Sequence, residues 1–265
     1  MREKRYALIT GGSSGLGLAF AKNLAGKGYV PLLIARRKDK LDEAVDAIKK
    51  MGFDGEGFQG DITSPKDLNG ISETLKTRFG KIDFLVLNAG VVSVRLLADY
   101  RDYERMKEVV EIDLWGTILS ARMFLPLLIS GSQILMISSA FGLIGAAGYS
   151  TYCAAKAGMI NFAEALRREL LYRGISVYVA CPADIDTPQY AEEKKSMPEW
   201  MSKTASARHS LLSPEKAARK ILSQCKGKRF LITINSEVSL LRILSKILPR
   251  RIMSSLLDSS LPRPR

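Results

Sequence analysis

The sequence predicts a doubly wound α/β domain, with a parallel sheet of about seven strands and helices on both faces of the sheet. Short β-branched or apolar runs alternate with longer amphipathic runs along the 265 residues, and this alternation is typical of βα units that pair in parallel. A glycine-rich turn, GGSSGLG, follows the first strand-like run and opens a helical pattern. Right-handed crossovers between such units place helices on both faces.

Seven runs are predicted to be strands: residues 6–10, 29–35, 55–61, 82–88, 133–138, 175–181 and 229–234. Two of the intervening helices have clear starts, because Ser64 and Ser213 each precede a proline and so suit the N-cap position. No linker divides the pattern, and we expect one domain over residues 1–235. Residues 184–212 are longer than an ordinary connection, which predicts a lid over the substrate. Residues 236–265 form a basic, amphipathic C-terminal extension.

Composition narrows the class of protein. With 46% hydrophobic and 25% charged residues, the chain suits a globular domain. No apolar run approaches the roughly 18 residues of a membrane span, and no signal-peptide pattern opens the sequence. The net charge is +13, and nine Lys/Arg against two acids lie between Lys226 and Arg265. This uneven charge indicates a local electrostatic role rather than nucleic-acid binding by the whole fold.

Cysteine and histidine usage excludes several chemistries. Cys153, Cys181 and Cys225 have no metal-like spacing, and their odd number argues against a disulfide framework. His209 is the one histidine, so neither a multi-histidine metal site nor a Ser-His-Asp triad on another histidine can form. His209 lies in a polar stretch and is expected to be a loop residue. We therefore predict no metal and a reducing, cytoplasmic location.

The glycine-rich turn predicts a dinucleotide site in a Rossmann-type sheet. Glycines let the backbone approach a pyrophosphate, and the helix that follows presents free N–H groups to it. A carboxylate at the end of the second strand would select NAD, whereas arginine there accommodates a 2′-phosphate. The sequence has Arg36, Arg37 and Lys40 at that point, which favours NADPH/NADP+ over the alternative of a solvated basic helix start. The predicted residues of the turn are Gly11, Ser13, Ser14, Gly15, Leu16 and Gly17.

A tyrosine and a lysine lie one helical turn apart in the stretch GYSTYCAAKAG. The spacing of Tyr152 and Lys156 places both on one helix face. In one interpretation they are ordinary solvated residues. In the other, the ammonium lowers the pKa of the phenol from its usual value near ~10, so that the phenol exchanges a proton with a carbonyl or an alcohol.

These elements together resemble the short-chain dehydrogenase/reductase family, and the resemblance covers residues 6 to about 234. Ser139 lies 13 residues before Tyr152, as the catalytic serine and tyrosine of the family do. Several motifs in order, each after a predicted strand, make the resemblance specific. The matching stretches are TGGSSGLG (10–17), GD (60–61), NAG (88–90), SS (138–139), YCAAK (152–156) and PADIDT (182–187).

The resemblance implies a role for each motif. Tyr152 protonates the substrate carbonyl as hydride arrives from the nicotinamide. Lys156 lowers the pKa of that phenol and binds the nicotinamide ribose, while Ser139 orients the carbonyl. The implied cofactor contacts beyond the glycine turn are Asp61 and Ile62 at the adenine, Asn88, Ala89 and Gly90 along the adenosine, and Pro182, Ile185 and Thr187 over the nicotinamide.

Two departures from the family pattern stand out. Asp113 replaces the usual asparagine, which holds a proton-relay water largely through its backbone carbonyl; a carboxylate there is expected to keep the geometry but to alter the pH profile. Ala183 replaces a glycine. The stretch PADIDTPQYAEE is similar to P-P-D-T-D-T-P-x-x-x-x-E of 3-ketodihydrosphingosine reductases. It implies NADPH-dependent reduction of the 3-keto group of a long-chain base.

Alternatives for the function and expectations for the partners remain at this point. If the substrate is not a long-chain base, it is another lipophilic carbonyl compound, of the 3-oxoacyl or steroid-like class. If the protein has no turnover, it is an NADP(H)-binding regulator. A homo-oligomer is a further expected partner. In the tail, Leu240, Leu244, Ile247 and Leu248 fall on one helical face and Ser239, Arg242, Lys246 and Arg250 on the other. This predicts either packing on the domain or a peripheral contact with a membrane surface.

Overall fold

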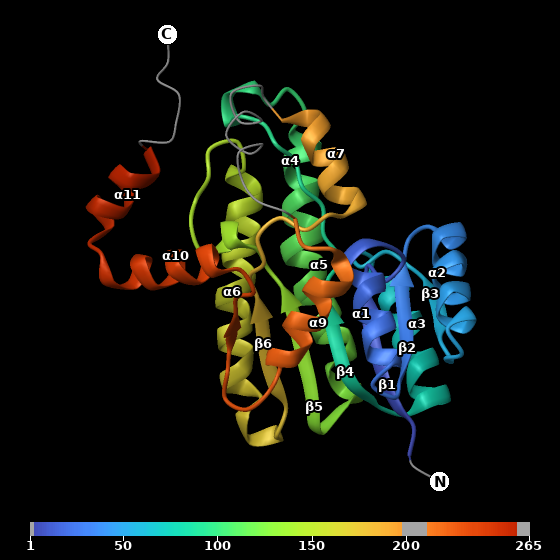
Figure 1. Ribbon diagram of the computed structural model, residues 1–265. Helices are drawn as coiled ribbons and strands as arrows, with labels where there is room; N and C mark the ends of the chain where they lie inside the picture. Colours follow the sequence, from blue (N-terminus) through green and yellow to red (C-terminus); the bar gives the residue numbers. More distant parts are fainter. Residues whose placement is uncertain (1–2, 198–210, 259–265) are drawn as a thin grey trace.

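The computed structural model describes residues 3–197 and 211–258, which form a layered α/β molecule (Figure 1). Its seven strands make one sheet in the order β3-β2-β1-β4-β5-β6-β7, and every neighbouring pair is parallel. This confirms the predicted fold class. The strands are β1 (Arg5–Thr10), β2 (Tyr29–Ala35), β3 (Glu56–Gln59), β4 (Ile82–Leu87), β5 (Leu128–Ile137), β6 (Ser176–Ala180) and β7 (Leu231–Ile232).

All seven predicted strands exist, and the main differences lie at their ends. β5 begins five residues before the predicted run, at Leu128, through a polar stretch that contains Gly131 at φ 90°. The Ser132 hydroxyl there donates to the Ile82 carbonyl at 2.8 Å and joins this stretch to β4. At the opposite edge, only Leu231 and Ile232 pair with β6, so β7 is shorter than predicted.

Helices connect the strands, and the two predicted proline starts are confirmed. Ser64 accepts a hydrogen bond from the Asp67 amide, and Ser213 accepts one from the Lys216 amide. A π-helical turn, η2 (Glu111–Trp115), joins α4 to α5. The α-helices are α1 (Gly15–Ala25), α2 (Lys38–Lys50), α3 (Pro65–Phe79), α4 (Tyr103–Val110), α5 (Gly116–Phe124), α6 (Ser150–Glu169), α7 (Pro188–Ser196), α9 (Pro214–Gln224), α10 (Ser236–Ile247) and α11 (Arg250–Asp258).

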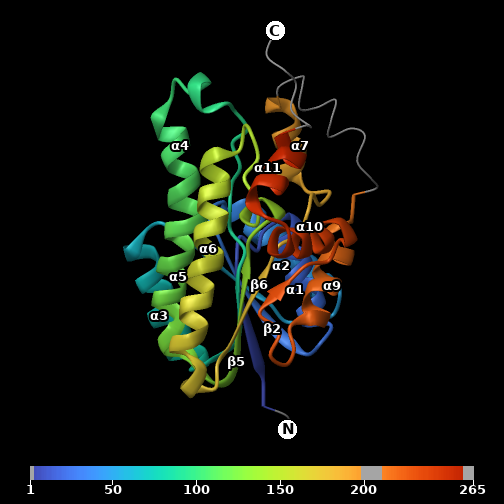
Figure 2. The ribbon, with the colours of Figure 1, turned by 90° about the vertical axis from the view of Figure 1, so that its left-hand side faces the viewer.

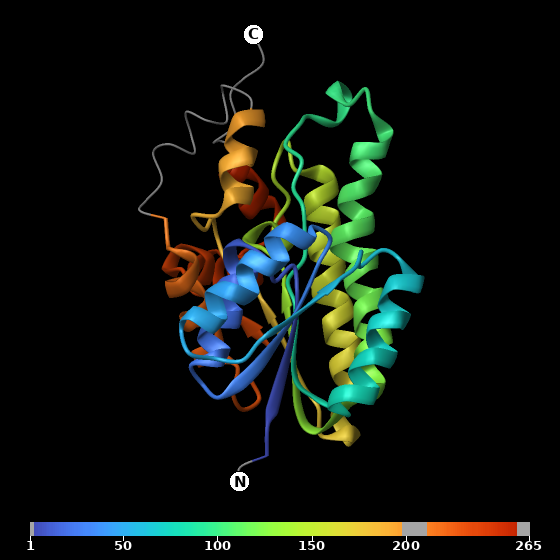
Figure 3. The same cartoon turned by 90° about the vertical axis from the view of Figure 1, so that its right-hand side faces the viewer.

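The sheet lies between two helical layers. Helices α1, α2 and α9 cover one face, and their apolar side chains pack with Ile9 and Val86 in one core cluster. Helices α3, α5 and α6 cover the other face, where a second cluster surrounds Leu8 and Leu85. Figures 2 and 3 show the two layers from opposite sides of the molecule. Neighbouring residues of a strand thus enter opposite cores, as a doubly covered sheet requires.

The strand order reverses between β1 and β4, and ligands of such sheets bind outside the carboxyl ends of the strands at this point. Helix α7 lies above that edge, while α10 and α11 extend outward from the side of the molecule that carries β7 (Figures 1 and 2). Over the described residues, no helix combines the length and the apolar character that crossing a membrane requires.

Candidate active site

A cavity of about 1140 Å³ opens at the carboxyl edge of the sheet, where the strand order reverses. It brings together most of the residues that the sequence predicts for the site. Gly17, Lys40 and Asp113 are the predicted residues that lie outside its lining. The predicted residues that line it are Gly11, Ser13, Ser14, Gly15, Leu16, Arg36, Arg37, Asp61, Ile62, Asn88, Ala89, Gly90, Ser139, Tyr152, Lys156, Pro182, Ile185 and Thr187.

The glycine turn is shaped by close backbone approaches. Gly11 has φ +64°, and a Cβ there would lie 2.8 Å from the Ala89 Cα atom. A Cβ on Gly17 would lie 2.1 Å from the Gly11 carbonyl oxygen, so Gly17 supports the turn from behind rather than lining the cavity. Among the described residues, no side chain caps the N-terminus of α1 and no acid lies in its first turn. Its free N–H groups and its positive dipole end therefore suit the pyrophosphate of a dinucleotide.

The end of β2 carries the cations expected to select the cofactor. Arg36 and Arg37 are exposed at the cavity edge. Lys40 was predicted to join them, but its ammonium pairs with Glu43 at 2.7 Å along α2. Lys40 thus pairs with a residue one turn further along its own helix, and not with the other cations at the cavity edge. On the next loop, Asp61 Oδ1 accepts bonds from the Thr63 amide and hydroxyl, both at 2.8 Å, which orients its carboxylate.

Three side chains that the sequence predicts to be catalytic line the same cavity. Ser139 follows β5, and Tyr152 and Lys156 lie one turn apart on α6. The Lys156 side chain is buried, with its ammonium 5.4 Å from the centre of the Tyr152 ring. That ammonium donates to the Ile137 carbonyl at 3.1 Å and pairs with Asp113 Oδ2 at 3.0 Å. The lysine is therefore held by contacts from β5 and from the π-helical turn.

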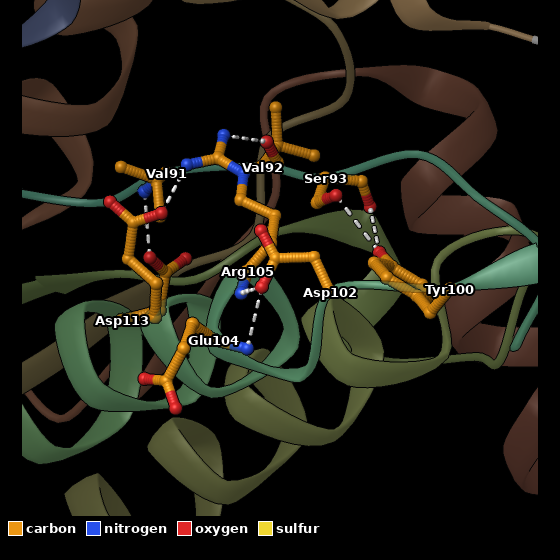
Figure 4. A network of polar contacts seen from close by, with 9 residues as sticks. Val91, Val92, Ser93, Tyr100, Asp102, Glu104, Arg105 and Asp113 are labelled. Atoms are coloured by element: carbon orange, nitrogen blue, oxygen red, sulfur yellow. Dashed lines mark hydrogen bonds and ion pairs between the residues drawn. The ribbon is translucent and has the colours of Figure 1, made fainter.

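Asp113 lies at the centre of the π-helical turn and is completely buried. Its Oδ1 accepts the Val91 amide at 2.7 Å (Figure 4), and its backbone carbonyl accepts the Thr117 hydroxyl at 2.8 Å. The carboxylate, rather than the backbone carbonyl, thus contacts Lys156. Burial raises the pKa of Asp113. The charge of Lys156 and the hydrogen bond from the Val91 amide both lower it, but by less. Short π-helical turns of this kind are frequent at functional sites.

The loop after β4 is tied to helix α4, as Figure 4 shows. The Arg105 guanidinium donates to the Val92 carbonyl at 3.2 Å and also pairs with Glu108. Asp102 caps α4 through the Arg105 and Glu104 amides. Arg105 and Val92 both line the cavity, so this network shapes part of its wall.

The pKa of Tyr152 shifts opposite to the expected direction. Burial raises the pKa of this phenol well above its ordinary value, and the negative charge of Asp113 raises it further. Among the main causes of the shift, the hydrogen bond of Ser139 alone lowers the pKa of Tyr152. The expected effect of Lys156 rested on the Tyr/Lys spacing alone. In the fold, the carboxylate of Asp113 pairs with that ammonium and offsets its charge.

The structure adds residues that the sequence reasoning missed. Arg105, Tyr190 and Glu193 line the cavity, and the Tyr149 hydroxyl donates to Glu193 Oε1 at 2.5 Å. A signal for Glu193 was present, because it occupies the final glutamate of the P-x-x-x-x-E pattern after Pro188. The contact between Tyr149 and Glu193 had no such signal, since it joins the residue before α6 to α7.

The predicted lid is described in part. Helix α7 forms its first half, and Thr187 caps it by accepting from the Tyr190 amide at 3.2 Å. An isolated parallel bridge between Ile185 and Leu212 closes the base of the segment. Residues 198–210, with His209, lie outside the described residues.

Comparisons with known proteins agree with this geometry. Residues 5–198 match the sequence profile described as short chain dehydrogenase. The 11-beta-hydroxysteroid dehydrogenase-like 4A of Arabidopsis thaliana is 31% identical over 256 residues, which covers 94% of this chain and 83% of that protein. The 3-oxoacyl-(acyl-carrier-protein) reductase FabG of Escherichia coli (strain K12) is 32% identical over 187 residues, which covers 70% of this chain and 75% of that protein.

A solved structure shares the fold over the entire chain. It is a short chain dehydrogenase/reductase from Burkholderia phymatum in complex with NAD, with a TM-score of 0.82. The match covers 100% of this chain and 99% of that one at 22% sequence identity. At this identity the likeness is evidence for the fold alone.

Proposed function

Because the chain belongs to the short-chain dehydrogenase family of oxidoreductases, we propose that it reduces a lipophilic ketone to an alcohol with NADPH. The observation that carries this proposal is that Ser139, Tyr152 and Lys156 line the same cavity as the glycine turn and a pair of arginines. A proton donor and a dinucleotide cradle thus share one space.

Each residue has a defined role in the proposed reaction. When bound, NADPH supplies the hydride that forms the new C–H bond at the carbonyl carbon. Tyr152 donates its phenolic proton to the carbonyl oxygen, so that a new O–H bond forms as the phenol loses its own. Ser139 donates a hydrogen bond that orients the carbonyl. Lys156 binds the ribose and is itself oriented by Ile137 and Asp113.

The protonation state of Tyr152 is compatible with the proposed proton transfer to the ketone. Since burial and the charge of Asp113 raise the pKa of Tyr152, the phenol stays protonated at neutral pH. A protonated phenol is the acid that ketone reduction needs, whereas alcohol oxidation needs the phenolate.

The preference for NADPH rests on Arg36, with Arg37 beside it. We expect Arg36→Asp to lower the ratio of kcat/KM for NADPH to that for NADH by about tenfold or more. A charge-assisted hydrogen bond to phosphate contributes about 1.5–3 kcal/mol, and the new carboxylate both repels the phosphate and accepts from the ribose. Initial rates with each cofactor measure the ratio.

The control for this substitution is Lys49→Asp. It changes the net charge equally but affects an exposed lysine in the last turn of α2. We expect its cofactor ratio to stay close to that of the wild type. Equal use of NADH and NADPH by the unmodified enzyme would overturn the assignment of Arg36.

The proposed substrate is 3-ketodihydrosphingosine, reduced to dihydrosphingosine. The similarity of PADIDTPQYAEE to the corresponding stretch of 3-ketodihydrosphingosine reductases supports it. The names of the relatives favour the second candidate, another lipophilic carbonyl of the 3-oxoacyl or steroid-like class. Apolar side chains beside Tyr152, among them Val92 and Phe141, suit either substrate.

A substrate panel separates these candidates. NADPH oxidation is measured with 3-ketodihydrosphingosine, a long-chain 3-oxoacyl thioester and a steroid ketone at equal concentrations. We expect the highest kcat/KM for the first. A higher value for either of the others would transfer the assignment to that class. Binding of NADPH without oxidation by any ketone would favour the regulatory alternative.

The C-terminal helices support a further proposal, a peripheral contact with an anionic membrane surface. Leu240, Ile243 and Ile247 form an apolar stripe on α10 and are 57%, 52% and 72% exposed. The predicted stripe differs in part, since Leu244 and Leu248 are half-buried. Lys246 and Arg251 are exposed cations of these two helices, whereas Arg242 is half-buried and donates to the Leu231 carbonyl at 3.4 Å. A basic residue near an anionic surface contributes about 1 kcal/mol. Apolar insertion next to cations is the pattern of an interfacial helix.

We expect the full-length protein to sediment with anionic vesicles, less so in high salt and weakly with neutral vesicles. Replacement of Leu240, Ile243 and Ile247 together by serine should abolish sedimentation without changing the net charge. Leu171→Ser is the control, because Leu171 is 61% exposed elsewhere on the molecule. A full-length protein that stays in the supernatant with every vesicle would mean that the stripe has no lipid partner.

A further inference from the structure

The segment that follows β6 forms part of the cavity wall and is held by hydrogen bonds from other elements. Pro182 and Ala183 line the cavity together with Tyr152. The Pro182 carbonyl accepts the Ala140 amide at 2.8 Å, and Ala140 directly follows Ser139. This part of the wall therefore adjoins the residues that are proposed to contact the reacting ketone.

The Ala183 amide donates to a side chain from the C-terminal part of the chain. Its acceptor is Asn235 Oδ1, at a distance of 3.3 Å and 52 residues further along the sequence. Asn235 lies between β7 and α10, at the N-cap position of α10. Since β7 pairs in parallel with β6, the sheet brings Asn235 to the segment that follows β6.

The carboxamide of Asn235 serves this contact rather than its own helix. Asparagine is a common N-cap residue because its side chain accepts an amide of the first helical turn. In the described part of the chain, the Asn235 side chain accepts no amide of α10. Its backbone carbonyl accepts the Ser239 amide at 3.0 Å and the Ser239 hydroxyl at 2.9 Å, and that hydroxyl lies 2.7 Å from the Thr233 hydroxyl. The first turn of α10 is thus fixed through Ser239, and the Asn235 side chain binds Ala183.

We propose that Asn235 positions this part of the wall against the nicotinamide half of the bound dinucleotide, and so determines how tightly that half is held. The inference rests on the proposed function, because the hydride must leave the nicotinamide beside Tyr152 and Ser139. A backbone segment that is fixed before binding loses less conformational entropy when the cofactor binds. Asn235 is thus a positioning residue, and it lies beyond residues 5–198, the part that matches the family profile.

Binding of NADP+ and of its adenosine half tests the inference without turnover. We use NADP+ and adenosine 2′,5′-bisphosphate, which lacks the nicotinamide, in calorimetric titrations of the full-length protein. Asn235→Leu has a similar size but no acceptor, and we expect it to bind NADP+ about three- to tenfold more weakly, as the loss of one neutral hydrogen bond provides. Its affinity for the bisphosphate should equal that of the wild type, because the arginine end of the cavity does not involve Ala183.

Two further variants complete the test. Asn235→Asp keeps the acceptor oxygen and should bind both ligands as the wild type does. Ser239→Ala removes the hydroxyl contacts at the start of α10 but leaves the contact with Ala183, so its affinity for NADP+ should also stay unchanged. The inference is overturned if Asn235→Leu binds NADP+ normally, if it loses affinity for both ligands equally, or if Asn235→Asp is as weak as Asn235→Leu. Binding of NADP+ that depends on Asn235, without oxidation of NADPH by any ketone, would instead contradict the proposed reaction alone.

Discussion

Replacing Tyr152 with phenylalanine is expected to lower the turnover of the ketone by about 10²–10⁴-fold, the range typical of a lost general acid. The ring remains in its place between Tyr149 and Lys156, and only the transferable proton is removed. NADPH affinity and the midpoint of thermal unfolding should therefore stay close to those of the wild type. Steady-state rates, cofactor titration and thermal melts of the purified variant measure the three quantities.

This substitution also separates catalysis from simple cofactor binding. A regulator that only binds NADP(H) would behave identically with tyrosine or phenylalanine at position 152. If Tyr152→Phe kept more than about a tenth of the wild-type rate, another group would have to supply the proton. Ser139 carries the other hydroxyl that is proposed to contact the carbonyl. A further loss of activity on Ser139→Ala in the Tyr152→Phe background would then identify Ser139 as the proton donor.

Replacing Lys156 with methionine is expected to reduce both activity and stability. The ammonium that we propose to bind the ribose is lost, and we expect kcat/KM to fall by roughly two orders of magnitude. Asp113, with 0% exposure, also loses the charge that pairs with it at 3.0 Å. Removal of one partner from a buried pair typically costs about 3–5 kcal/mol of unfolding free energy. Methionine has a similar length, so the loss reports the charge rather than a cavity.

The destabilisation should depend on pH with a defined sign. Burial already raises the pKa of Asp113, and without the lysine that pKa rises further, because the charge of Lys156 opposes the shift. A group whose pKa is raised on folding stabilises the fold at low pH and loses that contribution as the pH increases. Lys156→Met should thus be closest to the wild type near the ordinary aspartate value of about 4, and least stable at neutral and higher pH. Urea unfolding across this range measures it.

A double variant isolates the cause. Lys156→Met with Asp113→Asn contains neither charge, and we expect it to recover most of the lost stability at neutral pH but none of the activity. A double variant as unstable as the single one would show that the ion pair is not the source of the effect. Asp113→Asn alone should lower the pKa of Tyr152, since the Asp113 charge raises it, and should shift the pH dependence of alcohol oxidation to lower pH.

The parts of the site that were predictable from sequence are those with local causes. The turn from Gly11 to Gly17 needs glycines because the backbone approaches itself there. Gly11 has a positive φ, and a Cβ on Gly17 would lie only 2.1 Å from the Gly11 carbonyl oxygen. Ser64 and Ser213 cap helices through amides only three residues away. The start of β5 was missed for the opposite reason, because the polar stretch after Leu128 is joined to β4 by the contact of Ser132 with Ile82.

The sequence by itself determined the order of the strands and helices, the glycine turn and the placement of Ser139, Tyr152 and Lys156 along the chain. The tertiary structure decided the pKa shifts and the pairing of the charged side chains. The pKa of Tyr152 rises because the phenol is buried beside Asp113, Lys40 pairs along its own helix, and Glu193 meets Tyr149 across 44 residues. Desolvation and Coulomb energies depend on burial and on distances between residues far apart in sequence. Periodicity and motif spacing describe only neighbours along the chain, so the electrostatics of this cavity followed from the fold.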